Sequence, residues 1–288
     1  MNPAGVSVLI PVKNEEANLA ACLDSVRWAD EIFVVDSQST DNTARVALTA
    51  GAQVVQFQYT GAGPKKKNWS LAHLLFRNEW VLIVDADERV PPELAAEIRE
   101  SISRSDGPDG YYINRRFVFL DHWIRHCGWY PSWNLRLFRH RLGRYETVDV
   151  DAPNTGDNEV HEHVVLNGRA GYLRHDLLHH DYKGLFHYIE RHNRYSDWDS
   201  AVYLQLRRQP LWTRDQLNGP LRRKRMLKRL WTRLPFRPLL RFLYMYLLRA
   251  GFLDGAAGLH FCLLSSIHEY HIRLKMKEKA AHARLHER

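Results

Sequence analysis

Residues 78–94 read NEWVLIVDADERVPPEL, and this stretch decides the fold class. Its apolar run from Trp80 to Val84 predicts a strand that is buried on both faces. Two carboxylates, Asp85 and Asp87, follow where that strand ends. A helix over residues 93–102 comes next, because Pro91 and Pro92 are tolerated in a first helical turn. A buried strand, an acidic turn and a helix in this order are typical of a parallel α/β sheet.

The same alternation of strand and helix runs back to the amino terminus. We predict further strands at residues 6–10, 32–35 and 52–57, and helices after Asn14, after Asp41 and over 66–77. Right-handed crossovers bring the carboxyl ends of such strands to one edge of the sheet, where α/β proteins bind ligands. Polar clusters follow the strands at residues 13–15, 36–39 and 85–88. The sequence therefore predicts one ligand site that is built from three loops.

Missing motifs narrow the chemistry of that site. The first strand is followed by PVKNEE instead of GxGxxG, and neither GxxxxGK[ST] nor GxSxG occurs in the sequence. These absences argue against a dinucleotide fold, a P-loop enzyme and an α/β-hydrolase. The cysteines Cys22, Cys127 and Cys262 are too widely spaced for a disulfide framework or a thiolate zinc site. A nucleotide at this edge has to be held by carboxylates and cations.

Charge divides the chain into two parts. Residues 1–200 carry 22 Lys/Arg against 28 Asp/Glu, a net charge of −6, whereas residues 201–288 carry 19 against 5, a net charge of +14. Aromatic residues are dense over 103–182, where we expect short antiparallel strands and loops. We predict an α/β domain at 1–182 whose character changes after residue 103. A basic helical extension follows at 183–288.

The extension has the composition of a membrane-surface helix. Residues 235–249 are apolar around most of a helix, with Arg237, Arg241 and Arg249 interspersed. Such a helix is expected to lie on an anionic bilayer, or else to pack on the α/β domain with its arginines reaching water. Since the longest apolar run, Phe242 to Leu248, is too short to span a bilayer and no secretory signal is evident, we expect a cytoplasmic protein, peripheral at the inner face of the membrane. No nucleic-acid-binding module is recognised, so we expect no nucleic-acid partner.

Three blocks in order resemble family 2 glycosyltransferases of the GT-A fold: VSVLIPVKNEEANLAACLDSV, EIFVVDSQSTDNT and NEWVLIVDADERVPPEL. With GPKKKNWSL, GWYPSWNLRLFR, EVHEHV and LLHHDYKGLFHYIERHNRYS, the chain is similar to the lipopolysaccharide core β-glucosyltransferase branch. The resemblance implies a Rossmann-like, mostly parallel central sheet with helices on both faces and a helical C-terminal extension. It implies that 1–182 is a catalytic domain, with a nucleotide half at 1–103 and an acceptor half at 104–182. It also implies inverting, metal-dependent transfer of a hexose, most specifically glucose from UDP-glucose, to a glycolipid such as the lipopolysaccharide inner core. A protein or capsule acceptor, or a non-catalytic scaffold, remains the alternative.

The resemblance also implies roles for particular residues. Pro11 and Glu15 would line the nucleotide pocket, and Asp36 would accept a hydrogen bond from uracil. Lys67 would face the base or the ribose, and Arg136, rather than Arg139, would contact a phosphate or the substrate. Asp85 would hold the ribose and the metal, and Asp87 a Mg²⁺ or Mn²⁺ that bridges both phosphates.

Three further assignments carry alternatives. The base is expected to be Glu162, which a strand over 159–165 would place beside Val160 and Val164, although the same alternation nominates Glu159. His179, or else His180, would complete the metal site. Three aromatic residues either stack on a sugar or form core under the loops, namely Trp129, Tyr130 and Trp133.

Overall fold

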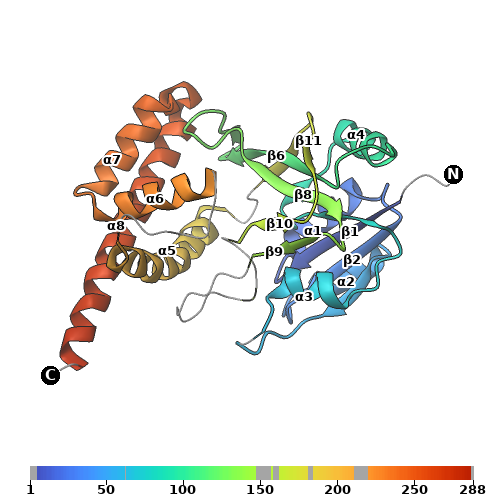
Figure 1. The fold of residues 1–288 in the computed structure, drawn as a ribbon, viewed down its shortest axis with the longest axis horizontal. Helices are drawn as coiled ribbons and strands as arrows, with labels where there is room; N and C mark the ends of the chain where they lie inside the picture. Colours follow the sequence, from blue (N-terminus) through green and yellow to red (C-terminus); the bar gives the residue numbers. More distant parts are fainter. Residues whose placement is uncertain are drawn as a thin grey trace. The chain divides into compact units, whose positions relative to one another are not determined.

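The computed structural model describes residues 5–61, 63–146, 157, 162–180, 184–210 and 220–286. These residues form two compact units, which are described one at a time (Figure 1). Unit 1 comprises the described residues up to His180, apart from 126–128. Unit 2 comprises residues 126–128 and the described residues from Gly184 onward.

Unit 1 is the α/β part of the chain. Its helices are α1 (Glu16–Ser25), α2 (Thr43–Thr49), α3 (Lys66–His73) and α4 (Pro92–Ile102). Its strands are β1 (Val6–Val12), β2 (Glu31–Asp36), β3 (Gln53–Gln56), β4 (Trp80–Ile83), β5 (Glu88–Arg89), β6 (Gly110–Phe119), β7 (His122–Trp123), β8 (Trp133–Arg139), β9 (Gly143–Tyr145), β10 (Val164–Leu166), β11 (Ala170–Tyr172) and β12 (Leu177–His180).

The main sheet has the strand order β3-β2-β1-β4-β8-β6-β12-β5, and β7 and β11 also pair with β6. The first four strands in this order are parallel, with Ile10 opposite Val34 and Val8 opposite Leu82. From β8 onward the sheet is mixed, because β8 runs antiparallel to both β4 and β6. The predicted parallel sheet is thus confirmed for the nucleotide half, and the acceptor half adds long antiparallel strands to it.

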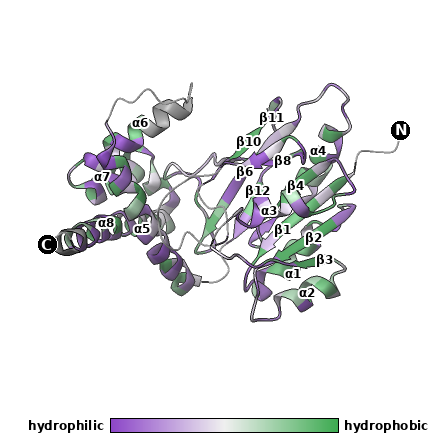
Figure 2. Ribbon diagram, turned by 60° about the horizontal axis from the view of Figure 1, so that its bottom comes forward, coloured by the Kyte–Doolittle hydropathy of each residue, from purple (hydrophilic) through white to green (hydrophobic). Residues whose placement is uncertain are grey.

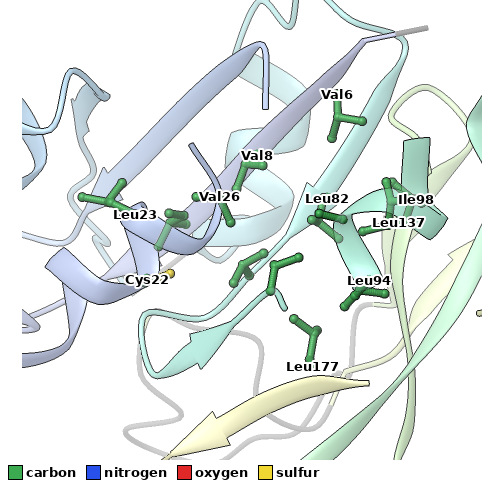
Figure 3. Packing of buried hydrophobic residues seen from close by; sticks show 14 of the residues in the cluster. Val6, Val8, Cys22, Leu23, Val26, Leu82, Leu94, Ile98, Leu137 and Leu177 are labelled. Carbon is green, nitrogen blue, oxygen red and sulfur yellow. The ribbon is translucent and has the colours of Figure 1, made fainter. Parts of the chain in front are cut away.

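Both faces of the parallel half are covered. Strand β1 alternates, so that Val8 and Ile10 join one hydrophobic cluster and Leu9 the other. The first cluster contains Cys22 and Leu23 of α1 and also residues of α2 and α4 (Figure 3). The second contains Leu71 of α3, with residues of β8 and β9. This near-continuous burial explains the unbroken apolar runs in the sequence, and it confirms helices on both faces of the sheet.

Helix α3 is shorter than its predicted range of 66–77. It ends at His73, and the next residue, Leu74, is extended. The chain turns away because Arg77 bonds to Glu31 at the start of β2: its backbone N–H donates to Oε2 at 3.1 Å, and its Nε lies 3.1 Å from Oε1. A tertiary contact, which the local helical pattern does not report, therefore overrides helix propensity here.

Unit 2 is helical. It contains α5 (Gly184–Arg208), α6 (Pro220–Arg233), α7 (Arg237–Leu243), a π-helical turn η1 (Tyr244–Leu248), a 3₁₀ turn η2 (Gly251–Asp254) and α8 (Gly255–His286). The single helix predicted for 235–249 is therefore α7 followed by η1. Phe236 and Ala250, both with left-handed backbone, delimit this segment.

No helix in the described part of the chain is by itself long and apolar enough to cross a bilayer. Residues 237–248 and 251–282 reach the required length and hydropathy only as a pair, and the two helices meet at a bend of 75°.

Candidate active site

The loop after β4 places Asp85 between two cations. Arg136 of β8 donates from Nη2 to Asp85 Oδ2 at 2.6 Å, and Lys67 Nζ of α3 lies 3.1 Å from Oδ1. Burial alone would raise the pKa of Asp85, but Arg136 and Lys67 hold it well below its usual range. The carboxylate is therefore ionised at neutral pH, and α3, β4 and β8 meet at its two oxygens.

Glu88 of β5 contacts both Arg136 and the turn that carries Asp85. Its side chain is fully buried, and Oε1 accepts a hydrogen bond of 2.9 Å from Arg136 Nη2. Oε2 accepts the backbone N–H of Asp85 at 2.9 Å, which closes the turn that carries both aspartates. Arg115 of β6 adds a second cation 3.6 Å from Oε1. Because it touches both the turn and Arg136, Glu88 orients Asp85.

Neither Glu88 nor Arg115 was singled out as a site residue by sequence reasoning. Glu88 belongs to the polar cluster after β4, which offered a signal for it. The sequence contains no signal for Arg115, because its approach to Glu88 depends on the order of strands in the mixed half of the sheet.

Asp87 faces a histidine from another strand. His179 of β12 lies opposite Glu88 of β5, and His179 Nε2 is 3.1 Å from Asp87 Oδ2. Burial of the imidazole opposes its charged form, but the Asp87 carboxylate outweighs this and raises the pKa of His179. His180 contributes its backbone N–H to the Asp87 carbonyl at 3.0 Å. Of the two histidines, the structure places His179 against Asp87.

Asp87 and His179 fit a divalent cation as a pair of protein ligands. A carboxylate oxygen and an imidazole nitrogen already lie within hydrogen-bond distance of each other at the edge of the sheet. Within the described residues, no group of three or more His, Cys, Asp or Glu side chains is arranged around one point. A cation here would thus take its remaining ligands from a diphosphate and water, which is how Mg²⁺ is commonly held beside phosphates.

The carboxyl ends of β1 and β2 lie next to this site in the sheet. Asp36 closes β2 and is buried, and it accepts hydrogen bonds from the Ser39 backbone N–H at 3.1 Å and from Gln56 Nε2 at 3.0 Å. Pro11 is buried in β1 opposite Val35. The expected uracil-facing carboxylate is therefore held in place by its neighbours.

Glu15 and the lysines of α3 border the same edge. Glu15 precedes α1, accepts from Asn18 Nδ2 at 2.9 Å, and donates its own N–H to Thr43 Oγ1 at 2.7 Å. Lys66 is buried and donates to the carbonyl of Val12 at 2.7 Å. Lys67 is also buried, with its ammonium 5.5 Å from the ring centre of Tyr145. Successive lysines thus bind two different strand ends, one at β1 and one at Asp85.

Glu162 is paired with a lysine. Its Oε1 lies 2.5 Å from Lys65 Nζ, and the glutamate side chain is 4% exposed. Glu162 precedes β10, which begins at Val164, so the strand expected over 159–165 is wrong at Glu162, and Val160 lies outside the described residues. Glu159, the alternative base, lies outside the described residues.

The aromatic residues of the loops have separate surroundings. Tyr130 donates to Asp176 Oδ2 at 3.1 Å, and Trp129 packs 5.5 Å from Phe117, centre to centre. Trp133 is 40% exposed and stands edge-on to Tyr172. Trp133 is thus the more accessible candidate for stacking on a sugar. Arg139 turns away from Asp85 and pairs with Glu79 and Asp109.

Carboxylates and cations at the carboxyl edge of a half-parallel sheet, without a glycine-rich phosphate loop, define the class of nucleotide-sugar transferases with a GT-A fold. The family model "Glycosyl transferase family 2" matches residues 7–160. The chain belongs to this family.

Several known proteins are similar to this chain. The lipopolysaccharide core biosynthesis glycosyltransferase LpsC of Rhizobium meliloti is 31% identical over 199 residues, which cover 66% of this chain and 68% of LpsC. The uncharacterized glycosyltransferase RT0209 of Rickettsia typhi is 32% identical over 169 residues, 58% of this chain and 55% of that protein. The chain therefore spans about half the length of this Rickettsia relative.

A solved structure is also similar in part. Glucosyl-3-phosphoglycerate synthase from Mycobacterium tuberculosis, in complex with Mn²⁺, UDP and glucosyl-3-phosphoglycerate, is 27% identical, with a TM-score of 0.32. The match covers 40% of this chain and 44% of that one. With a TM-score this low, the family assignment rests on the sequence match and on the sheet topology.

Proposed function

We propose that this glycosyltransferase moves a hexose, most specifically glucose from UDP-glucose, onto a glycolipid such as the lipopolysaccharide inner core, with inversion at the anomeric carbon. The observation that carries the proposal is the joining of Asp85, Arg136 and Lys67 beside the Asp87–His179 pair. The similarity to LpsC, a lipopolysaccharide core biosynthesis glycosyltransferase, supports a lipopolysaccharide core acceptor.

The donor would be held by the edge of the parallel strands. Asp36 would accept from the uracil ring, since its carboxylate is fixed at the end of β2, and Pro11 and Glu15 would border the base. Asp85 would bind the ribose hydroxyls. Lys67 would face the base or the ribose. Arg136 would contact the diphosphate, and its hydrogen bonds would strengthen as charge develops there.

A divalent cation, Mg²⁺ or Mn²⁺, would be held by Asp87 and His179 with Asp85 close by, and it would neutralise charge on the departing diphosphate. The residues of the chain then orient the donor. Glu88 keeps the turn of Asp85 and Asp87 in place through the Asp85 backbone N–H.

Glu162 would act as the base. The acceptor hydroxyl oxygen forms a bond to the anomeric carbon while the bond from that carbon to the diphosphate oxygen breaks, and the hydroxyl proton passes to the Glu162 carboxylate. Attack from the face opposite the leaving group inverts the configuration. Proton removal by a positioned carboxylate typically contributes on the order of 10²–10⁴ in rate.

A donor screen tests the proposal. UDP and GDP release would be measured from UDP-glucose, UDP-galactose and GDP-mannose, each with Mn²⁺ or with chelator, in the presence of a lipopolysaccharide core acceptor. We expect UDP release from UDP-glucose that stops with chelator and returns with Mn²⁺. Acceptors of the protein and capsule classes, tested in parallel, decide between the acceptor alternatives.

The matched variants are Asp87→Ala and Asp24→Ala. Asp24 is an exposed acid on α1 that pairs only with Arg27 among the ion pairs of the described residues. We expect Asp87→Ala to abolish turnover with the fold retained, and Asp24→Ala to leave turnover unchanged. Full turnover in Asp87→Ala would overturn the metal role, and failure of every nucleotide-sugar to turn over would favour the scaffold alternative.

A further inference from the structure

A cavity inside unit 2 is lined by an excess of cations. It has a volume of about 540 Å³ and lies among α5, α6, α7 and α8. Five basic side chains line it: Arg207, Arg233, Arg237, Arg273 and Lys277. None of its lining residues, all of which the structure describes, is acidic.

Arg237 is the buried member of this set. It is 3% exposed, and its Nε lies 3.3 Å from Glu269 Oε1, while its guanidinium lies over the ring of Tyr203. Its Nη1 is buried without a hydrogen-bond partner among the described residues. A buried guanidinium N–H that lacks an acceptor is costly, so this nitrogen is suited to an acceptor from outside the protein.

The other cations add positive charge around Arg237. Burial lowers the pKa of Arg237, Glu269 opposes this, and the neighbouring Arg273 and Arg207 lower the pKa further. Arg233 is committed to backbone carbonyls, donating to Arg229 at 2.9 Å from Nη1 and to Arg207 at 2.9 Å from Nη2. Arg207 and Arg273 form no ion pair within the described residues, which leaves both guanidinium groups available to an anion.

Apolar side chains adjoin this cavity and extend from it along α7. Leu204, Leu234 and Met276 are among its lining residues. Beyond Leu234, one stripe at helical spacing is turned to solvent over α7 and η1: Phe236, Leu239, Leu240, Leu243, Tyr244, Leu247 and Leu248. Phe236 is 67% exposed and Leu248 is 79% exposed. Figure 2 shows apolar and polar residues side by side on α7 and α8.

The sequence around this stripe carries one sign of charge. Between Asp215 and Asp254 there is no acidic residue, while lysines and arginines recur throughout. A helix that exposes large apolar residues among cations only is typical of segments that lie in the interface of an anionic bilayer. The charge therefore favours a lipid surface over a second copy of this chain, whose matching face would repeat the same positive charge.

We propose that the cavity of unit 2 binds the phosphomonoester headgroup of an anionic lipid, with the stripe Phe236–Leu248 seated in the membrane surface. Guanidinium groups bind phosphate through paired, charge-assisted hydrogen bonds, and a monoester offers three terminal oxygens to several donors at once. The inference stands on unit 2 alone and does not depend on the transfer reaction. It gives the basic extension a headgroup-selective role.

Vesicle binding of the full chain tests the proposal. Phosphatidylcholine vesicles would carry either phosphatidic acid, a monoester, or phosphatidylglycerol, a diester, in amounts adjusted to equal zeta potential. We expect wild-type protein to partition about tenfold more strongly onto the monoester vesicles, since charge-assisted hydrogen bonds add to the general attraction. Inorganic phosphate and glycerol phosphate serve as soluble competitors.

The variant Arg207→Gln/Arg273→Gln removes two lining cations, neither of which is fully buried. Its matched control, Arg208→Gln/Arg241→Gln, removes the same charge from α5 and α7 at residues outside the cavity lining. We expect the cavity variant to bind both vesicle types equally and the control to keep the preference for the monoester. Circular dichroism checks that both variants keep their helices.

A second pair of substitutions separates the stripe from the cavity. Phe236→Ser/Leu239→Ser should weaken partitioning onto both vesicle types while it keeps their ratio. An unchanged monoester preference in the cavity variant would overturn the proposal. So would tight binding of glycerol phosphate with no vesicle binding, which would assign the cavity to a soluble phosphate. Self-association through the stripe without vesicle binding would overturn it in favour of a second copy.

Discussion

Arg136 Nη2 lies 2.6 Å from Asp85 Oδ2, and the same nitrogen lies 2.9 Å from Oε1 of the fully buried Glu88. The Arg136 guanidinium thus links the carboxylate of Asp85 to the carboxylate of Glu88. Asp85 is held ionised by this contact, which ties the chemistry of the site to the stability of unit 1.

Removal of Arg136 should therefore affect folding as well as turnover. Arg136→Ala leaves Glu88 buried with Arg115 as its remaining ion-pair partner among the described residues, and breaking a buried pair costs about 3–5 kcal/mol in the free energy of unfolding. Urea unfolding measures the loss. Arg139→Ala, on the same strand with more exposed partners, should cost about 1 kcal/mol or less. Equal losses in the two variants would contradict this account.

Glu162→Gln should lower the turnover number by about 10²–10⁴ and leave the KM for the donor nearly unchanged, because the amide cannot accept the acceptor proton. Steady-state kinetics with varied donor measures both parameters. Glu146→Gln is the control, since Glu146 directly follows the neighbouring β9 and accepts from the His163 N–H at 3.2 Å. A Glu162→Gln enzyme with wild-type turnover would remove Glu162 from the mechanism.

His179→Ala and His180→Ala separate two adjacent histidines. His179 presents its ring to Asp87, so its removal should weaken the apparent affinity for Mn²⁺ by about tenfold or more. His180→Ala should change it little, because His180 contacts Asp87 through its backbone N–H. Activity titrated with Mn²⁺ measures both values, and a larger effect in His180→Ala would reverse the assignment.

Glu97 of α4 should make unit 1 sensitive to acid. Burial opposes its charge, but hydrogen bonds from the backbone N–H groups of Arg174 and His175, each 2.9 Å, hold the pKa of Glu97 below its ordinary 4.5. A lowered pKa in the folded state contributes stability above pH 4.5 that is lost as the pH falls through the folded-state value.

Glu97→Gln should accordingly cost about 1–3 kcal/mol at pH 7 and progressively less below pH 4.5. Urea unfolding between pH 3 and pH 7 gives the two curves. The control is Glu100→Gln, an exposed acid on the same helix, which should run parallel to wild type. A Glu97→Gln curve that also stays parallel would show that Glu97 carries none of the acid sensitivity.

The sequence alone was sufficient for the parallel half of the fold. Strands β1, β2 and β4 were predicted because a strand covered by helices on both faces needs an unbroken apolar run, and such runs are visible without knowledge of tertiary contacts. The polar clusters at the carboxyl ends of these strands could also be located from the sequence, because they directly follow the apolar runs. The end of α3 at His73 could not be predicted from the sequence, since it depends on the contact between Arg77 and Glu31.

The pairing of site residues was decided by tertiary structure. The periodicity around Glu162 indicated valine neighbours, but its partner is Lys65, 97 residues away in the sequence. Likewise Glu88 and Arg115 come together only because β12 lies between β5 and β6 in the sheet. Local patterns determine which residues can form a strand and where carboxylates follow it. Which cation neutralises which carboxylate depends on strand order and register, and these are set by packing between segments distant in the chain.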